Sequence, residues 1–320
     1  MSCSKVLVTG ANGFVGSAVV TKLLSSEKFS VVCGVRTPPQ KNLPCDHLFF
    51  ELGAEVPAAA LTGITEVVHA AARVHVMAAQ GADDLSAFRA ANVDGTIKLA
   101  TRAAQAGVKR FVFISSIKVN GEYTHPGRPF TSSDLPTPVD AYGISKREAE
   151  DALIELGART GMEIVIIRPP LVYGPGVKAN FLNMLRWVER GIPLPFGSIN
   201  NRRSMVALDN LVDLIVRCIE HPSAPGNIFL VSDGEDLSTT QLLQRVAQSL
   251  GVRSALIPFP QQILSLGLVL LGKQALSVRL CGSLQVDVRR TCELLQWSPP
   301  VGIEQALEGV AKHYLDTKNK

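Results

Sequence analysis

Lys5-Val-Leu-Val-Thr9-Gly10-Ala11-Asn12-Gly13-Phe14-Val15-Gly16 is the stretch that decides the fold of this 320-residue chain. An apolar run precedes the three glycines and a helical pattern follows them, as in a strand, a tight turn and a helix. The first glycine permits the sharp turn, the second lets backbone approach a pyrophosphate, and the third lets the helix pack against the strand. The stretch therefore predicts a dinucleotide-binding loop, to which Asn12, Phe14 and Val15 also belong.

Strand-like and helix-like segments alternate over the first 170 residues. Apolar, β-branched runs occur at 5–9, 30–35, 65–70, 110–115 and 163–168, with a weaker one at 47–52. Ala-rich helical stretches lie at about 14–26, 84–106 and 141–160. Continuous apolar strands separated by amphipathic helices indicate a parallel sheet that is covered on both faces. We expect an α/β fold, with a doubly wound Rossmann domain over residues 1–170.

The sequence changes character after residue 170, where glycine and proline cluster. Helical patterns follow at about 180–190, 208–221, 239–250 and 304–316, with one strand pattern at 227–231. We expect residues 171–320 to form mainly a smaller α/β lobe that holds the substrate. The segment at about 203–221 is expected to return and pack on the Rossmann domain.

The composition excludes several classes of protein. Apolar residues make up 46% of the chain and charged residues 19%, which provides a large core and argues against disorder. The net charge of +4 is scattered along the chain, so a nucleic-acid-coating protein is not expected. Six cysteines, at 3, 33, 45, 218, 281 and 292, form no C-x-x-C pair, which predicts reduced thiols and no metal site. A strand pattern that begins at Lys5 leaves no room for a signal peptide, so we expect a cytoplasmic protein.

The second and third strand patterns along the chain, at 30–35 and 47–52, bear on the choice of cofactor. The second ends in Arg36, where an acidic residue would hydrogen-bond the adenosine ribose and favour NAD. A guanidinium can instead pair with a 2′-phosphate or stack on adenine, so NADP(H) is favoured and NAD(H) is the alternative. A solvated arginine with no ligand is also open at this position. Glu51 and Leu52, at the end of the third strand pattern (47–52), are expected to hold the adenine.

A second set of residues predicts proton transfer. Tyr142 and Lys146 are four residues apart at the start of a predicted helix, so the phenol and the ammonium share one face. A nearby cation, helped by the charge of NAD(P)⁺ itself, favours the phenolate and is expected to bring the pKa of Tyr142 into a useful range. Ser115 and Ser116 lie at the carboxyl end of the strand pattern that begins at Arg110, at the edge where open α/β sheets bind ligands.

Together these residues resemble the extended short-chain dehydrogenase/reductases, specifically the nucleotide-sugar epimerase/dehydratase/reductase family. The order and spacing of the motifs agree over essentially the whole chain. The motifs are Thr9-Gly10 through Gly16, His69-Ala-Ala-Ala72, Asn92-Val-Asp-Gly-Thr96, Ser115-Ser116, Tyr142 with Lys146, Arg168-Pro169, Val172-Tyr-Gly-Pro175, Arg203-Ser-Met-Val-Ala-Leu-Asp209 and Leu294-Leu-Gln-Trp297.

The resemblance implies a role for individual residues. Ser116 rather than Ser115 is the catalytic hydroxyl, Tyr142 is the acid and base, and Lys146 is its partner. Cofactor contacts are implied at Ala70, Ala71, Ala72, Asn92 and Pro169. Asn92 also holds a kink in its helix. A UDP-sugar is implied as the substrate, with its diphosphate bound by Asn180, Arg203 and Arg279.

Three departures from the family pattern favour a reductase over an epimerase. Asn120 stands where the family usually has Tyr, Leu171 stands where many 4-epimerases have Asn, and Arg36 replaces an acid. The segments 115–122, 197–203 and 282–287 resemble bacterial 4-reductases of UDP-4-keto-6-deoxy-N-acetylhexosamines in surface-polysaccharide biosynthesis. The alternative is a UDP-hexose 4-epimerase, acting on UDP-GlcNAc or UDP-Glc, that retains NAD. A non-catalytic dinucleotide-binding regulator is a remote alternative.

Two further expectations concern surfaces. The family resemblance implies a homodimer, in which the helices near 84–106 and 141–160 pair through apolar faces that contain Phe88, Ile97, Leu99, Leu153 and Leu156. The alternative is that these side chains cover the sheet within one chain. The apolar segment 255–280 is expected to be a helix within the second lobe, or alternatively an exposed surface that contacts a membrane.

Overall fold

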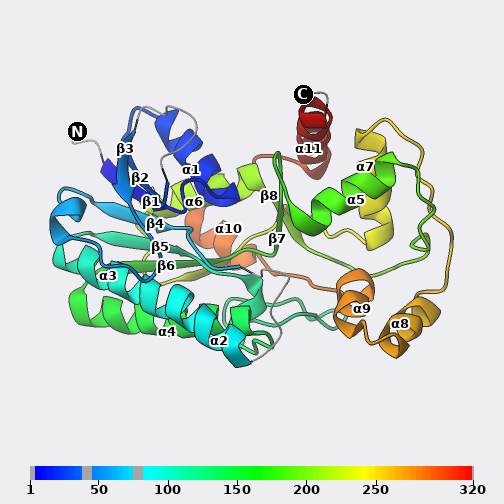
Figure 1. Cartoon of the computed structure of the whole chain (residues 1–320), viewed down its shortest axis with the longest axis horizontal. Coiled ribbons are helices and arrows are strands. Elements are labelled where there is room, and N and C mark those ends of the chain that lie inside the picture. The colour runs from blue at the N-terminus through cyan, green and yellow to red at the C-terminus, as the bar shows by residue number, and fades with distance from the viewer. Residues whose placement is uncertain (1–3, 38–44, 75–81, 319–320) are drawn as a thin grey trace.

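A seven-stranded parallel sheet forms the larger part of the molecule (Figure 1). The computed structural model describes residues 4–37, 45–74 and 82–318. The strands are β1 (Ser4–Thr9), β2 (Phe29–Val35), β3 (Asp46–Phe49), β4 (Glu66–His69), β5 (Arg110–Ile114), β6 (Glu163–Arg168) and β9 (Ile228–Leu230). Their spatial order is β3-β2-β1-β4-β5-β6-β9. The expected doubly wound α/β fold is confirmed, and the carboxyl ends of all these strands meet at one edge.

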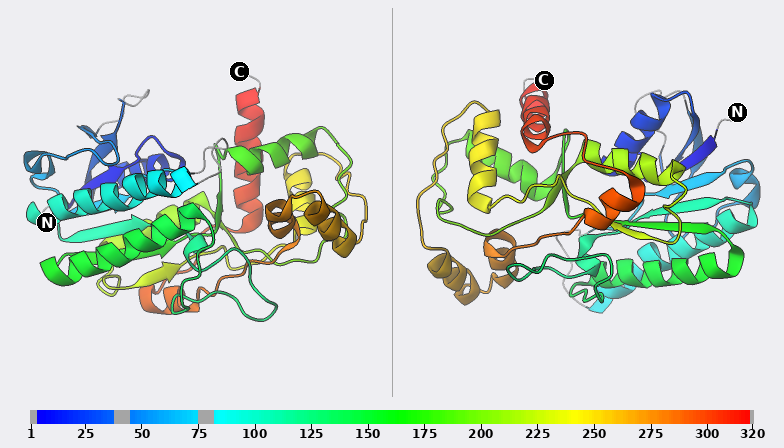
Figure 2. Two further views of the ribbon diagram at one scale, coloured as in Figure 1. Left: turned by 60° about the horizontal axis from the view of Figure 1, so that its bottom comes forward. Right: turned by 180° about the vertical axis from the view of Figure 1, so that it is seen from behind.

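Helices cover both faces of this sheet, as Figures 1 and 2 show. Helices α1 (Phe14–Leu24) and α6 (Leu208–Glu220) lie on one face, and α3 (Gly95–Gln105) and α4 (Ala141–Thr160) lie on the other. Alternate residues of β1 supply the two cores, because Val6 and Val8 face α1 and α6 whereas Leu7 faces α3 and α4. Both faces of the strand are therefore apolar, which is why its sequence is a continuous apolar run.

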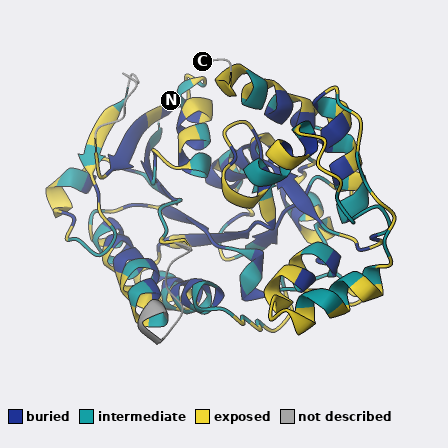
Figure 3. Cartoon of the chain, turned by 45° about the vertical axis from the view of Figure 1, so that its right-hand side comes forward, coloured by how far each residue is buried: buried dark blue, intermediate teal, exposed yellow. Residues whose placement is uncertain are grey.

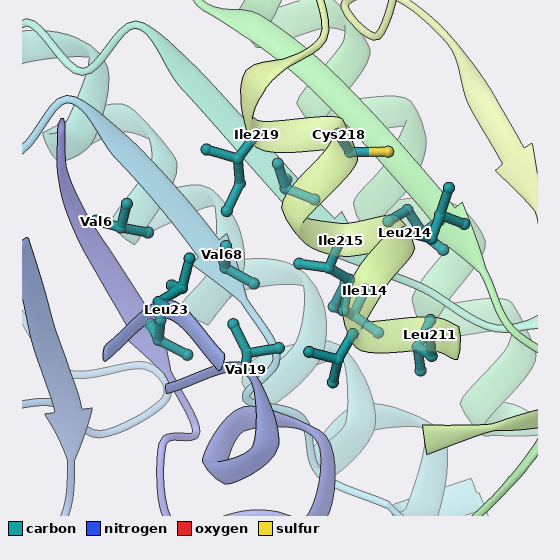
Figure 4. Packing of buried hydrophobic residues seen from close by; sticks show 14 of the residues in the cluster. Val6, Val19, Leu23, Val68, Ile114, Leu211, Leu214, Ile215, Cys218 and Ile219 are labelled. Carbon is teal, nitrogen blue, oxygen red and sulfur yellow. The ribbon is translucent and has the colours of Figure 1, made fainter. Parts of the chain in front are cut away.

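Helix α6 shows how the first core is built (Figure 4). Its inward residues Leu211, Leu214 and Ile215 are fully buried against strand residues such as Val68 and Ile114. Burying each such side chain contributes about 1.5–3 kcal/mol relative to leaving it in water. This packing fixes α6 to the sheet even though α6 lies far along the chain from α1.

The helical pattern expected at 84–106 forms three elements rather than one. It comprises α2 (Ala82–Phe88), a π-helix η2 (Arg89–Asp94) and α3. Asn92 lies in the π-helix, where its Oδ1 accepts the Arg73 N–H at 2.8 Å and its Nδ2 donates to the Arg73 carbonyl at 3.1 Å. A side chain that bonds to backbone outside its own helix accounts for the local widening.

A smaller lobe follows the large sheet. Strands β7 (Leu171–Tyr173) and β8 (Met205–Ala207) form a two-stranded parallel sheet. Helices α5 (Ala179–Glu189), α7 (Thr239–Ser249) and α11 (Ile303–Lys318) share one apolar core beside it. Helices α8 (Gln261–Leu270) and α9 (Gln274–Cys281) lie at the outer corner, far from β3 (Figure 1).

The second half of the chain returns to the large sheet over more residues than the expected 203–221. Strand β9, expected within the smaller lobe, pairs with β6 through Ile166 and Ile228. After α9, helix α10 (Arg289–Leu295) returns as well, and Trp297 packs in the core of α1 and α6. The Trp297 Nε1 donates to Asp213 of α6 at 2.9 Å. Strand β9 therefore extends the large sheet beyond β6, although it comes late in the chain.

The apolar side chains expected to form a dimer face are mostly used inside the chain. Phe88, Leu99, Leu153 and Leu156 are each at most 3% exposed, and the last three pack in the core under α3 and α4. These four side chains are therefore unavailable to a second copy, whereas Ile97 is half-buried and Ile154 on α4 is 46% exposed. The homodimer stays a prediction without that support. Within the described part of the chain, no helix has both the length and the apolar character needed to cross a bilayer.

Candidate active site

The glycine-rich loop joins β1 to α1 at the carboxyl edge of the sheet. Gly10 has φ 68°, and a Cβ on it would lie 2.8 Å from the Ala71 backbone nitrogen. A Cβ on Gly16 would overlap the carbonyl oxygen of Gly10, so strand and helix could not approach as they do. Gly13 is the N-cap of α1 and supplies no side-chain cap, while the first turn, which includes Phe14 and Val15, has no acid. The N–H groups of this helix are therefore left to an anion such as a pyrophosphate.

The residues predicted to bind the adenosine lie along the same edge. Arg36 is exposed directly after β2, and the Asn12 Nδ2 donates to the Thr37 carbonyl at 3.0 Å. Glu51 is exposed and Leu52 is half-buried after β3. The half-buried run Ala70, Ala71 and Ala72 follows β4. The structure thus places these predicted residues at the ends of adjacent strands, and an exposed Arg36 is compatible with either dinucleotide.

A buried histidine joins the loop to the opposite helix layer. The Thr9 Oγ1 and the His69 Nδ1 are 2.7 Å apart, and the His69 Nε2 is 3.0 Å from the Thr96 Oγ1. Burial, with a smaller contribution from the Lys146 charge, lowers the pKa of His69 to about 3. His69 is therefore neutral and links β1, β4 and α3. The sequence motif contained His69 but gave it no role, although a histidine that ends a buried strand was the available signal.

Lys146, on helix α4, has its ammonium group at the carboxyl end of strand β5. Its Nζ donates to the Ile114 carbonyl at 2.7 Å and lies 4.3 Å from the centre of the Phe113 ring. Burial lowers the pKa of Lys146 to about 7, and the nearby Glu150 carboxylate opposes that change. The side chain is 1% exposed, so the ammonium is held at the end of β5 rather than in solvent.

Tyr142 occupies the first turn of the same helix, in surroundings that raise the pKa of its phenol. Asp140 caps α4 by accepting the Gly143 N–H at 2.7 Å. The Lys146 Nζ is 6.0 Å from the Tyr142 ring centre and is hydrogen-bonded elsewhere. Burial raises the pKa of Tyr142, and the Asp140 charge raises it further. In the protein itself Tyr142 is therefore a phenol at neutral pH, and the lowering expected from Lys146 together with a bound NAD(P)⁺ stays a prediction.

The two serines after β5 have different surroundings. Ser115 is 3% exposed and its hydroxyl donates to Glu150. Ser116 is half-buried and caps the short 3₁₀ helix η3 (Ile117–Val119), its Oγ accepting the Lys118 N–H at 3.3 Å. A Cβ on Gly143 would lie 2.9 Å from the Lys118 carbonyl, so η3 and the start of α4 are in close contact. Ser116, Tyr142 and Lys146 therefore belong to one neighbourhood.

A buried ion pair behind the site was missed by sequence reasoning. Glu150 and Arg168 are fully buried and paired, with Nη2 to Oε2 at 2.5 Å and Nε to Oε1 at 3.0 Å. Arg168 also donates to the Asn120 Oδ1 at 2.9 Å, which gives a role to one residue that departs from the family pattern. The available signal was the position of Glu150, four residues after Lys146 on the same helix face.

Asn92 and Pro169 complete the predicted cofactor residues. The Asn92 Nδ2 donates to the Ser145 Oγ at 3.1 Å, beside Lys146. Pro169 is buried after β6, and its carbonyl accepts the Ile117 N–H at 3.0 Å. Both residues therefore support the backbone on which Ser116 and Lys146 lie.

The predicted diphosphate ligands lie in the smaller lobe. The Arg203 Nη1 donates to the Gly282 carbonyl at 3.0 Å. Gly282 is the C-cap of α9, and Arg279 lies in the last turn of that helix. Burial lowers the pKa of Arg203, and the positive charge of Arg279 lowers it further. Two neighbouring cations form a site suited to an anion. Asn180 is exposed at the start of α5, where Ala179 before it has φ 53°.

Three potential metal ligands meet at the edge of the large sheet, where the sequence predicted no metal site. The ligand atoms of Cys33, Cys45 and His47 all lie within 4.8 Å of one another, and the two sulfur atoms are 2.9 Å apart. Cys33 faces His47 across the β2–β3 pair, which spacing along the chain does not reveal. Burial and the Cys45 thiol raise the pKa of Cys33 to about 12. The five described cysteines are free thiols, and Cys3 lies outside the described residues.

Comparisons with known proteins agree with this geometry. Residues 6–232 match the NAD dependent epimerase/dehydratase family. A Vibrio cholerae UDP-glucose 4-epimerase is 46% identical over 98% of this chain and 97% of its own length. The solved structure of MoeE5 with UDP-glucuronic acid and NAD is 25% identical, with a TM-score of 0.79 over 98% of this chain and all of that one. The Bacillus cereus UDP-glucuronic acid 4-epimerase in complex with NAD has the same TM-score at 21% identity, over 98% of this chain and 99% of that one, and shares the fold.

Proposed function

The chain belongs to the NAD dependent epimerase/dehydratase family, and from this premise we propose that it is a UDP-hexose 4-epimerase that retains NAD. The observation that carries the proposal is the Ser116, Tyr142 and Lys146 neighbourhood at the sheet edge, beside the uncapped N-terminus of α1. The 46% identity to a UDP-glucose 4-epimerase supports this alternative better than the reductase interpretation of the sequence.

The residues at the sheet edge fit a dinucleotide. Gly10 and Gly16 leave no room for side chains between β1 and α1, and the free N–H groups of α1 face that edge. Arg36, Glu51 and Leu52 would hold the adenosine. Ala70–Ala72 would contact the dinucleotide beside them. Asn92, Lys146 and Pro169 would lie toward the nicotinamide end. Bound NAD⁺ supplies a hydride acceptor and a positive charge near the reacting carbon.

Tyr142 would move the proton. When the C4 hydroxyl of the sugar is oxidised, its proton passes to Tyr142, and the same proton returns when the C4 ketone is reduced on the other face. Because the protein by itself raises the pKa of Tyr142, positive charge from Lys146 and from the oxidised cofactor is needed to favour the phenolate. Ser116 would hydrogen-bond the sugar O4 and hold it beside the phenol.

Arg203 and Arg279 would hold the diphosphate of the UDP-sugar. Their mutual repulsion, which contributes to the lowered pKa of Arg203, is relieved when an anion lies between them. Asn180 would contact the same group from α5. This arrangement keeps the nucleotide in the smaller lobe while the sugar reaches the sheet edge.

Reduction of a UDP-4-keto sugar is the second candidate. Arg36 follows β2 without an acidic partner for a ribose, and Leu171 on β7 is 46% exposed where many 4-epimerases have Asn. An exchangeable NADPH would suit these residues. The same three catalytic side chains would then deliver a proton once, with net oxidation of the cofactor.

The experiment is to identify the nucleotide that purifies with the full chain and to assay it with UDP-glucose and UDP-GlcNAc. The epimerase proposal requires retained NAD and formation of the C4 epimer with no net change in cofactor absorbance. Consumption of NADPH with a UDP-4-keto-6-deoxy-N-acetylhexosamine would instead establish the reductase. Binding of a dinucleotide with neither reaction would establish the regulator.

Tyr142→Phe tests the assigned acid and base. The variant keeps the ring but has no proton to exchange, so we expect kcat to fall by about 10²–10⁴-fold with nucleotide binding retained. Tyr123→Phe is the matched control, because Tyr123 is 54% exposed and has no assigned part in the proton transfer. Full activity of Tyr142→Phe would remove Tyr142 from the mechanism.

A further inference from the structure

Helix α8 is an apolar helix that the rest of the chain does not cover. Its sequence is Gln-Gln-Ile-Leu-Ser-Leu-Gly-Leu-Val-Leu, and none of its residues is buried. Exposed apolar side chains surround it and the turn into α9, with fractional exposures from 41% to 78%. They are Ile257, Ile263, Leu266, Val269, Leu270, Leu271 and Leu276, which we call the α8–α9 apolar face. In Figure 3 most of this corner of the molecule has the colours of exposed and intermediate residues.

Polar contacts hold this hairpin in place from behind. The Ser265 and Ser277 hydroxyl oxygens are 2.8 Å apart between the two helices. Gln261 anchors the base, since its Nε2 donates to the Cys281 carbonyl at 3.0 Å and its Oε1 accepts the Asn200 N–H at 3.0 Å. Because polar groups supply these inward contacts, several large aliphatic side chains are directed to solvent. The expected packing of segment 255–280 inside the lobe is therefore not what the structure has.

The charged residues in the segment that carries this face are all positive. No aspartate or glutamate occurs between Asp236 and Asp287, a stretch that contains Arg245, Arg253, Lys273 and Arg279. Arg245 is paired with acids outside the stretch. Lys273 is exposed in the turn between the exposed leucines, and Arg279 is exposed on α9. An apolar face whose own segment contains cations and no acids complements a surface that is both apolar and anionic.

We propose that the α8–α9 apolar face docks this protein on an anionic lipid bilayer, with α8 lying in the plane of the headgroups. A helix of 10 residues is about 15 Å long, half of the hydrocarbon thickness, so it lies on a bilayer and does not cross it. A second copy of the chain is a poorer occupant. Pairing two such faces would bring two acid-free cationic segments together.

Docking would also orient the smaller lobe. Arg279, one of the two arginines at the anion site, lies on α9 together with Leu276 of the apolar face, and its charge reaches Arg203. A bilayer against α8 would therefore lie beside the anion site of the smaller lobe. This inference goes beyond the proposed function and does not depend on it, because its test measures binding to lipid and not turnover.

Flotation of the full chain with vesicles tests the proposal. One set is phosphatidylcholine alone, and the other contains about one quarter phosphatidylglycerol. We expect the protein to float with the anionic vesicles, weakly with the neutral ones, and less at high salt. The double variant Leu266→Glu, Leu270→Glu should reduce flotation by at least about ten-fold, because it removes buried apolar area and adds repulsion.

Leu135→Glu with Val139→Glu is the matched control. These side chains are 86% and 70% exposed elsewhere, so this variant should float as the wild type does. Circular dichroism establishes that both double variants are folded. Absence of flotation with anionic vesicles, or equal flotation of the α8 variant, would overturn the proposal. So would a wild-type dimer in sedimentation that the α8 variant abolishes, since a second copy would then cover the face.

Discussion

Glu150 is the residue whose loss should cost the molecule most among those behind the site. Glu150→Gln leaves the Arg168 guanidinium buried without its counter-charge, so we expect the free energy of unfolding to fall by about 3–5 kcal/mol. Urea denaturation measures the change. Glu148→Gln is the matched control on the same helix, because its partner Arg89 is at the surface, and it should cost at most about 1 kcal/mol. Equal effects of the two variants would contradict the buried-pair argument.

His69 makes the stability depend on pH in a defined direction. Its pKa is about 3 in the folded protein against 6.5 in the unfolded chain, so below pH 6.5 the unfolded state binds a proton that the folded state does not. Stability conferred by neutral His69 is therefore lost as the pH falls. Between pH 7 and 5 the wild type should lose about 2 kcal/mol more than His69→Gln, which has no such titration. Denaturant unfolding at the two pH values tests this, and parallel losses would refute it.

Strand β1 and helix α1, which we propose hold the cofactor, approach each other closely at the loop glycines. Gly16→Ala places a methyl group on the Gly10 carbonyl oxygen, so α1 must shift away from β1. We expect at least a ten-fold loss of NAD affinity, about 1.4 kcal/mol, by calorimetry. Gly302→Ala is the control, because a Cβ there meets no atom within 4 Å and should leave the affinity unchanged. Unchanged affinity of Gly16→Ala would show that the loop does not hold the dinucleotide.

Much of the large sheet could be predicted from the sequence, because its strands are buried on both faces and read as apolar runs. The runs at 5–9, 110–115 and 163–168 match β1, β5 and β6 within one residue. The strands β7 and β8 have three residues each, too few to show a period. The π-helix depends on a contact between Asn92 and a distant backbone, which no local pattern contains.

The candidate site could be predicted where its residues are close in sequence. Tyr142 and Lys146 share a helix face through their spacing, and the loop glycines occur within seven residues. Residues joined only by the fold were missed. Glu150 meets Arg168 across the end of β6, and Cys33 meets His47 through strand register. Burial and the Asp140 charge, which raise the pKa of Tyr142 in the protein by itself, could not be predicted from the sequence, and the lowering by Lys146 together with bound NAD(P)⁺ stays a prediction.

On the scale of the whole molecule, one carboxylate links the smaller lobe to the large sheet. Asp233, just after β9, accepts the Tyr173 hydroxyl at 2.8 Å and the Ala207 N–H and Asn210 Nδ2 at 2.7 Å each. Tyr173→Phe should lower the free energy of unfolding by about 1–2 kcal/mol, because a buried hydrogen bond is lost. Tyr314→Phe, which breaks a half-buried bond to Glu189 on the far side of the lobe, should cost less. Equal losses in thermal or urea unfolding would argue against this link.

The repeated return of the chain to the large sheet bears on how new specificities can arise. The large sheet and its cores are built from the chain before β7 and, later in the chain, from α6, β9 and α10. The other lobe is built from β7, β8, α5, α7 and α11. A chimaera made by joining two relatives at a single crossover would therefore split both cores. Recombination within this architecture must exchange several short segments together, so substrate preference is expected to change by substitutions in place rather than by transplanting a module.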